Sequence, residues 1–254
     1  MMPDLQQVGE GQTQQWAPNT TAPVVLLENV SKTYGKIHAL SEITLALSGG
    51  VTGILGTNGA GKSTVMRVLL GMLDATSGSV KFDGKDISML STQERINHGM
   101  AFVPQTKNVF PSMTVEENLQ MGGFIRKDDI SKTIDEVYEL FPILHEKRKQ
   151  LAEQLSGGQR QQVAFGRAMM TRPSVMLLDE PTAGVSPIVM DEIFSNILDV
   201  RNAGMAVLMV EQNAQQALNI ADKGYVLVSG RNEHTGTGKE LINNPEVRKK
   251  FLGG

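Results

Sequence analysis

Cysteine is absent from all 254 residues of this sequence. Disulfide bonds, thiolate catalysis and cysteine-ligated zinc are therefore excluded, while a reducing compartment is allowed. A strong charge of either sign is also missing, because the formal net charge is only −3. Composition therefore gives no electrostatic reason to expect nucleic acid as a partner.

Long apolar runs are missing as well. No stretch approaches the roughly 20 residues that a membrane-spanning helix needs. The N-terminus lacks the basic region followed by an apolar region that marks a secretory signal. We therefore expect a soluble, cytoplasmic protein whose role at a membrane, if it has one, depends on a partner.

The first 22 residues differ in composition from the rest of the chain. Residues 1–22 are rich in Gln, Thr, Gly and Pro, and they cannot bury enough apolar surface to offset the entropy lost on ordering. This composition predicts a flexible tail. Apolar residues make up 40% of the whole chain, which is enough for a packed core. We expect the folded domain to cover 23–254.

The most informative stretch is residues 56–64, with the letters GTNGAGKST. It matches the phosphate-binding pattern G-x-x-x-x-G-K-[ST] at every fixed position. A predicted strand at 51–55 precedes it and a predicted helix at 65–70 follows it. In this arrangement backbone N–H groups and the helix N-terminus surround a chain of phosphates; Lys62 reaches the β- and γ-phosphates, and the Ser63 hydroxyl ligates Mg²⁺. The predicted nucleotide-binding residues here are Gly56, Thr57, Asn58, Gly59, Ala60, Gly61, Lys62, Ser63 and Thr64.

Short strands flank this loop in the sequence. Residues 24–30 and 43–47 are predicted as strands, with 31–35 as a turn. A further strand at 77–85 closes with an Asp-Gly turn. We therefore expect antiparallel strands beside the nucleotide loop.

Two later strands end in polar side chains. An apolar run that begins at Met100 is followed at once by Gln105, and a second run, from Ser174, ends in Asp179 and Glu180. Parallel strands buried on both faces have this composition, and ligands collect at the carboxyl ends of such strands. Asp179 can hold Mg²⁺ together with the loop serine, and Glu180 can polarise an attacking water.

The segment between these two strands is predicted to be helical. Residues 110–151 have a helical pattern, and the apolar residues between Ile130 and Phe141 fall on one helical face. At 155–159 (LSGGQ), Ser156 and Gln159 have the spacing of a capping box, which predicts the start of another helix. Two glycines open its N-terminus, making it a second anion-binding site. A single nucleotide site within one monomer does not explain a second anion-binding helix.

The remaining chain alternates between strands and helices. We predict strands at 205–210 and 224–230 and helices at 188–202, 214–222 and 239–252.

The order of these motifs resembles the ATP-binding subunits of ABC transporters, over roughly 24–254. The resemblance rests on an aromatic residue before the first strand pair, the phosphate loop, a glutamine loop, the LSGGQ motif and an acid-tipped strand; these are Tyr34, 56–64, Gln105, 155–159, and Asp179 with Glu180. It implies an α/β fold: a P-loop NTPase (RecA-like) core with an N-terminal antiparallel β subdomain and an inserted α-helical subdomain at about 88–170. Because this segment has its own apolar stripe and Gln105 lies at its entrance, we expect residues 88–150 to move as a unit hinged near Gln105.

The same resemblance implies roles for these residues. Two subunits dimerise head to tail, and each ATP lies between one phosphate loop and the partner's LSGGQ motif, which supplies Ser156, Gly157, Gly158 and Gln159 in trans. Tyr34 stacks on adenine, and Gln105 senses the γ-phosphate and helps Ser63 and Asp179 to hold Mg²⁺. The expected catalytic residues are Glu180 as the base, with Lys62, Gln105 and Gln212.

Four short stretches of the sequence resemble one subgroup in particular, the ATPases of branched-chain (hydrophobic) amino acid importers. These stretches are residues 34–40, 113–119, 210–213 and 251–254. The expected partners are a second ABC ATPase subunit, membrane-spanning permease subunits and, indirectly, a solute-binding protein, at the cytoplasmic face of the inner or plasma membrane. Urea or short-amide importers, lipid-related ABC ATPases and soluble non-transport ABC ATPases remain alternatives, and the transported solute stays open.

Two residues depart from the general family pattern. Gln212 stands where the family usually has histidine, and Ser186 stands where aspartate is common in the loop after the catalytic acid. Glutamine can hydrogen-bond a phosphate oxygen but cannot carry a proton as imidazolium does. We expect weakened rather than abolished hydrolysis. Both features suit a heterodimer with two unlike sites, although a homodimer remains open.

Overall fold

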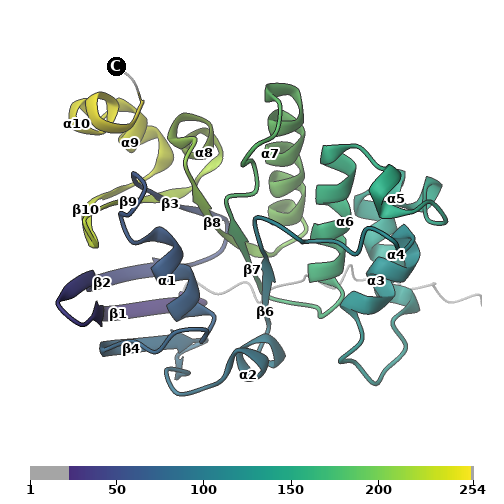
Figure 1. Ribbon diagram of the computed structural model, residues 1–254, viewed down its shortest axis with the longest axis horizontal. Helices are drawn as coiled ribbons and strands as arrows, with labels where there is room; N and C mark the ends of the chain where they lie inside the picture. Colours follow the sequence, from purple (N-terminus) through teal and green to yellow (C-terminus); the bar gives the residue numbers. More distant parts are fainter. Residues whose placement is uncertain (1–22, 253–254) are drawn as a thin grey trace, which may run out of the picture.

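The structure is a computed structural model that describes residues 23–252, so the tail predicted at 1–22 lies outside the described residues. A six-stranded sheet crosses the middle of the molecule (Figure 1). Its strands are, in spatial order, β10 (Arg231–Gly236), β9 (Lys223–Val228), β3 (Val51–Leu55), β8 (Ala206–Glu211), β7 (Val175–Asp179) and β6 (Met100–Val103). From β9 to β6 all neighbours are parallel, whereas β10 pairs antiparallel with β9.

The apolar composition of these strands follows from burial on both faces. Along β7, Met176 and Leu178 belong to one hydrophobic cluster, and Val175 and Leu177 belong to another on the opposite face. The first cluster also contains side chains of the long helix α7 (Pro187–Asn202), and the second contains those of α1 (Lys62–Leu69). Because neither face meets water, every position of the strand favours an apolar residue.

A second, antiparallel sheet lies beside α1 (Figure 1). Its order is β2 (Ile37–Leu47), β1 (Val25–Tyr34), β4 (Ser77–Phe82) and β5 (Lys85–Asp86). The turn predicted at 31–35 is wrong, because β1 continues to Tyr34 and pairs there with Ile37. Register shifts within β1 interrupt the alternation of apolar and polar residues, so its polar second half does not have the pattern of a strand.

Most of the remaining helices gather at the end of the molecule opposite this antiparallel sheet (Figure 1). They are α3 (Val115–Gly122), α4 (Ser131–Leu140), α5 (Pro142–Glu146), the 3₁₀ turn Ala152–Gln154 and α6 (Gly157–Met169). The range expected for the helical subdomain, about 88–170, also contains α2 (Thr92–Asn97) and β6, and β6 pairs with β7 in the central sheet. A separately moving helical subdomain stays a prediction.

The C-terminal part departs most from the sequence-based expectation. The helix predicted at 214–222 is α8 (Ala214–Ile220), but the single helix predicted at 239–252 is wrong. The chain forms α9 (Gly238–Asn243), α10 (Pro245–Val247) and a π-helical turn, Arg248–Leu252. Asn244 is extended and caps α10 (φ −73°, ψ 122°) because the residue before a proline avoids the helical region. Within the described residues no helix is long and apolar enough to cross a membrane.

Candidate functional site

The glycine loop joins the end of β3 to the start of α1. Gly61 caps α1 with φ +103°, and a side-chain carbon there would lie 2.8 Å from Leu40 and 2.9 Å from the carbonyl of Ala39. Gly59 has φ +80° and nothing within 4 Å of such a carbon, so its other side is open. The cap makes no side-chain hydrogen bond, which leaves the first N–H groups of α1 available. The loop therefore fits a bound chain of phosphates.

Lys62 lies across this loop. Its side chain is 5% exposed, and Nζ donates to the carbonyls of Gly56 at 2.8 Å and Thr57 at 3.2 Å. Burial lowers the pKa of Lys62, and the carboxylates of Glu180, Asp179 and Glu211 oppose that shift. The ammonium group is thus hydrogen-bonded to two backbone carbonyl oxygens, and phosphate oxygens can replace them as its acceptors.

Three predicted residues meet at the carboxyl ends of β6, β7 and β8, because these parallel strands are neighbours. Nε2 of Gln105 donates to Oε2 of Glu180 at 3.1 Å. Nε2 of Gln212 donates to Oε1 and Oε2 of Glu180 at 3.0 and 2.9 Å. Both amides therefore hold one carboxylate, and charged acceptors of this kind make comparatively strong hydrogen bonds.

Asp179 lies next to this carboxylate and is half-buried. Burial raises the pKa of Asp179 and so does the adjacent charge of Glu180, whereas Arg67 and Lys62 lower it. A carboxylate under this repulsion favours a cation nearby. Oxygen donors such as this carboxylate and the exposed hydroxyl of Ser63 suit Mg²⁺, so the residues present fit that ion.

The two remaining predicted features are the aromatic residue of β1 and the LSGGQ motif at the start of α6. Tyr34 ends β1 with 46% of its surface exposed, and its ring centroid is 5.4 Å from Nζ of Lys32. Ser156 caps α6: its hydroxyl accepts from the N–H of Gln159, and the side-chain oxygen of Gln159 accepts from the N–H of Ser156, both at 3.2 Å. This confirms the predicted capping box. Helix α6 lies among the helices at the end of the molecule opposite the antiparallel sheet beside α1 (Figure 1).

Sequence reasoning missed Glu211, the last residue of β8. It is 2% exposed, and its carboxylate accepts hydrogen bonds from Thr182 and from the backbone of Gln212. The available signal was an acidic residue that ends an otherwise apolar strand at the same sheet edge as Asp179 and Glu180.

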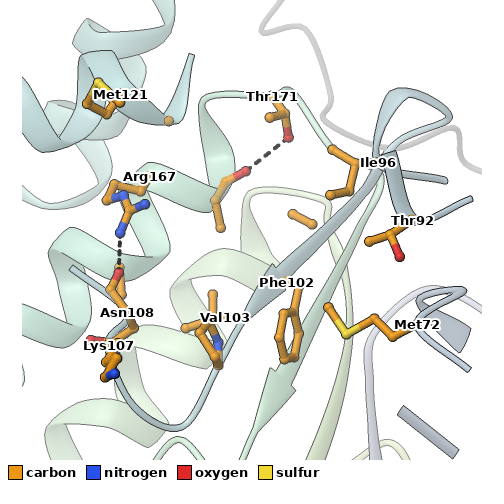
Figure 2. Close-up of a pocket in the computed structure, with 15 residues that line it drawn as sticks. Met72, Thr92, Ile96, Phe102, Val103, Lys107, Asn108, Met121, Arg167 and Thr171 are labelled. Atoms are coloured by element: carbon orange, nitrogen blue, oxygen red, sulfur yellow. Dashed lines mark hydrogen bonds between the residues drawn. The ribbon is translucent and has the colours of Figure 1, made fainter. Parts of the chain in front are cut away.

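A groove of about 300 Å³ lies between β6 and α6 (Figure 2). Its walls include the apolar side chains of Met72, Ile96, Phe102 and Met121. A guanidinium stands among them: that of Arg167 donates to the Asn108 carbonyl at 2.5 Å and lies 4.4 Å from the Phe110 ring centroid. Burial lowers the pKa of Arg167. The groove thus combines an apolar lining with one partly desolvated positive charge.

The loop, its lysine and the acid-tipped strand define a P-loop nucleotide-binding protein with a mixed α/β core. The family model described as "ABC transporter" matches residues 40–183. The chain belongs to the ABC transporter family and is an ATPase subunit with an ATP-binding cassette fold. The fold class predicted from the motifs is thereby confirmed.

Individual relatives agree with this family. The chain is 44% identical to the high-affinity branched-chain amino acid transport ATP-binding protein BraG of Pseudomonas aeruginosa, over 89% of this chain and 98% of the relative. It is 36% identical to the lipopolysaccharide export system ATP-binding protein LptB of Haemophilus influenzae, over 91% and 97%. The ADP conformation of MJ1267, an ATP-binding cassette of an ABC transporter, superposes with a TM-score of 0.83 at 31% identity, covering 92% of this chain and all of that one.

Proposed function

We propose that this chain hydrolyses ATP to energise the import of branched-chain or other hydrophobic amino acids. The observation that carries the proposal is the carboxylate of Glu180, held by Gln105 and Gln212 at the sheet edge. The similarity to BraG, at 44% identity, supports the choice of solute class. Urea and short-amide importers share the same chemistry in this subunit, since an ATPase subunit need not touch the solute.

In the proposed reaction the phosphates of ATP bind at the N-terminus of α1. Lys62 exchanges the carbonyls of Gly56 and Thr57 for the β- and γ-phosphates, where its charge offsets the charge that develops in phosphoryl transfer. Glu180 orients and polarises the attacking water. Ser63, Gln105 and Asp179 would hold Mg²⁺, which neutralises charge on the phosphate oxygens when bound.

Gln212 contributes hydrogen bonding without proton transfer. Its amide donates to Glu180 and can donate to a γ-phosphate oxygen instead, but it takes up no proton at physiological pH. We therefore expect slower hydrolysis than with an imidazolium at this position.

We propose a head-to-tail dimer with the second anion-suited helix acting in trans. Ser156, Gly157, Gly158 and Gln159 at the start of α6 would contact the ATP bound to the other subunit. In support, α6 lies among the helices at the end of the molecule opposite the antiparallel sheet, whereas α1 lies beside that sheet (Figure 1), and Ser156 is exposed. The other subunit can be a second copy or a different ATPase. A different ATPase would suit the departures at Gln212 and Ser186.

Membrane-spanning permease subunits are the second kind of partner that we propose. The groove between β6 and α6 suits an amphipathic helix from such a subunit, because its walls are apolar and include Met121 of α3 (Figure 2). Two further apolar side chains, Phe124 and Ile125, are exposed in the segment that follows α3. Arg167 would pair with an acidic residue of that helix. The chain would then lie on the cytoplasmic face of the membrane, with a solute-binding protein only indirectly attached. We expect no nucleic acid partner.

A lipid-related function is the second candidate, because LptB is 36% identical over nearly the whole chain. Purification of the tagged full chain from its native membranes in mild detergent, with partners identified by mass, distinguishes the two. We expect permease subunits whose reconstitution gives ATP-dependent uptake of leucine or valine. Lipid-transport partners would favour the alternative. Recovery of the chain alone or with nucleic acid would overturn the transport proposal.

A further inference from the structure

Glu211 is a buried acid that the proposed reaction does not use directly. It ends β8, is 2% exposed and lies immediately before Gln212. Burial raises its pKa, and hydrogen bonds from Thr182 and from the backbone of Gln212 and Asn213 oppose this shift. A buried carboxyl group is costly unless hydrogen bonds compensate for the lost water, so its partners indicate its role.

Those partners belong to two different loops. Oε1 of Glu211 accepts from the Thr182 N–H at 3.0 Å and from the Thr182 hydroxyl at 2.7 Å. Oε2 accepts from the N–H of Gln212 at 3.0 Å. Thr182 is 4% exposed, so water competes little for its hydroxyl. One side chain therefore joins the loop after β7 to the loop after β8.

The loop after β7 contains a backbone conformation that needs such support. Glu180 has φ +46°, in the left-handed region that residues with a side chain rarely adopt. Conformations of this kind persist where the surroundings impose them. The N–H of Glu180 donates to the Val210 carbonyl of β8 at 2.9 Å, and two residues later Thr182 is held by Glu211. Strand β8 therefore holds the chain at Glu180 and again just beyond it.

The second loop completes a closed path of contacts. Glu211 holds the backbone of Gln212, the amide of Gln212 donates to the carboxylate of Glu180, and the chain from Glu180 leads back to Thr182 and Glu211. We infer that Glu211 and Thr182 are positioning residues for ATP hydrolysis, which fix the carboxylate of Glu180 from both sides. This inference rests on the proposed role of Glu180 as the base.

A role as counter-charge to Lys62 accounts for less of the geometry. Nζ of Lys62 donates to the carbonyls of Gly56 and Thr57. The hydrogen bonds of Glu211 point instead to Thr182 and Gln212, both of which lie on the loops around Glu180.

The test compares Thr182→Val with Thr182→Ser and Glu211→Gln in the purified full chain. Thr182→Val keeps the shape and the N–H but removes the hydroxyl that binds Glu211. Thr182→Ser keeps the hydroxyl. The matched control is Thr133→Val in α4, because Thr133 is also buried and its hydroxyl accepts from Arg126 at 2.8 Å and Arg172 at 3.0 Å.

We expect Thr182→Val to lower kcat about 10- to 100-fold, because a misplacement of about 1 Å at a reacting group has an effect of this size. The KM for ATP and the binding of a non-hydrolysable ATP analogue should not change. Thr182→Ser should restore most of the lost kcat. Glu211→Gln should lower kcat in the same way. The NH₂ of the new amide is itself a donor, and it would face a group that donates to Glu211 in the parent, either Thr182 or the N–H of Gln212. Thr133→Val should lower Tm and leave kcat unchanged.

Parental kcat in Thr182→Val would overturn the inference. So would a loss of kcat that Thr182→Ser does not reverse, or one that Thr133→Val reproduces at an equal loss of Tm. The parent chain in the same assay reports on the proposed function separately. If the parent bound ATP but did not hydrolyse it, the assignment of Glu180 would fail first. If Glu211→Gln did not fold, the Thr182 pair would still decide the question.

Discussion

Gln105 and Gln212 donate to the same atom, Oε2 of Glu180, from opposite neighbouring strands, at 3.1 and 2.9 Å. Gln105 follows β6 and Gln212 follows β8, while Glu180 follows the strand between them. The two amides therefore share one carboxylate oxygen of Glu180. If Glu180 is the base that we propose, a nucleotide that draws either amide away would free that oxygen for water and so link nucleotide binding to the activation of the base.

Replacement of Glu180 by Gln should stall hydrolysis while ATP still binds. The amide keeps the shape but cannot polarise water as a base, and we expect kcat to fall about 100-fold or more. Steady-state hydrolysis and equilibrium binding of labelled ATP measure the two effects separately. Glu139→Gln, at an exposed position of α4, is the control. Hydrolysis at the parental rate by Glu180→Gln would show that another group is the base.

Replacement of Gln212 by His should raise kcat several-fold and add a pH dependence. The imidazole would lie beside Glu180, whose negative charge raises the histidine pKa above its usual value of about 6.5. The charged form stabilises phosphate oxygens, so the gain should be present at low pH and disappear as pH rises through that pKa. The ratio of the two kcat values between pH 5.5 and 9 measures it, and a constant ratio would contradict the prediction.

The parts of the site that sequence reasoning anticipated depend on local chemistry. The glycine loop needs a strand, a tight turn and a helix start within fifteen residues or so, and a capping box needs two residues three apart. Both can be read without knowledge of the fold, and the structure has both hydrogen bonds of the Ser156–Gln159 box. Helix α2 has the same capping box, formed by Ser91 and Glu94. Sequence reasoning missed this helix because it is only six residues long.

The missed features depend on contacts between distant segments. Glu211 accepts a hydrogen bond from Thr182, which is 29 residues away in the chain and adjacent only because β7 and β8 pair. Strand β10 alternates exposed and half-buried positions with polar residues, so its apolar pattern is weak. The groove beside Arg167 combines residues from 72 to 171, and no local pattern indicates it.

Asp179→Asn should stabilise the nucleotide-free chain. Burial and Glu180 raise the pKa of Asp179, so the folded state disfavours its charged form, and at pH 7 the charge costs stability. The cost should shrink as pH falls through the raised pKa, and the stabilising effect of the substitution should shrink with it. Thermal unfolding at pH 7 should give a higher Tm for the variant, while Tm should rise less on addition of Mg²⁺ and ADP. Asp135→Asn, at an exposed position, is the control.

Ser156→Arg should abolish hydrolysis and leave ATP binding to the isolated chain intact. Loss of the cap costs about 1 kcal/mol, which a folded chain tolerates, but the bulky cation would lie where we propose that the partner's ATP binds. In a homodimer, mixing Ser156→Arg with Glu180→Gln chains should recover activity. One of the two sites in a mixed dimer then combines Glu180 of the first chain with Ser156 of the second, and only the other site contains both substitutions. If the mixture stayed inactive although the chains associated, the proposed arrangement in trans would be contradicted.

The groove between β6 and α6 should matter for coupling and not for the chemistry of hydrolysis. Met121 lines it and is 39% exposed, so Met121→Glu places a charge against the apolar helix that we propose docks there (Figure 2). We expect basal hydrolysis by the purified chain to be unchanged and recovery of permease subunits from membranes to fall at least about tenfold. The new carboxylate would lose its water at the interface and would compete for Arg167 with the acidic residue proposed on the docked helix. Met89→Glu is the matched control, because Met89 is 96% exposed and does not line the groove. Equal recovery of permease subunits with both variants would place the docking surface elsewhere on the chain.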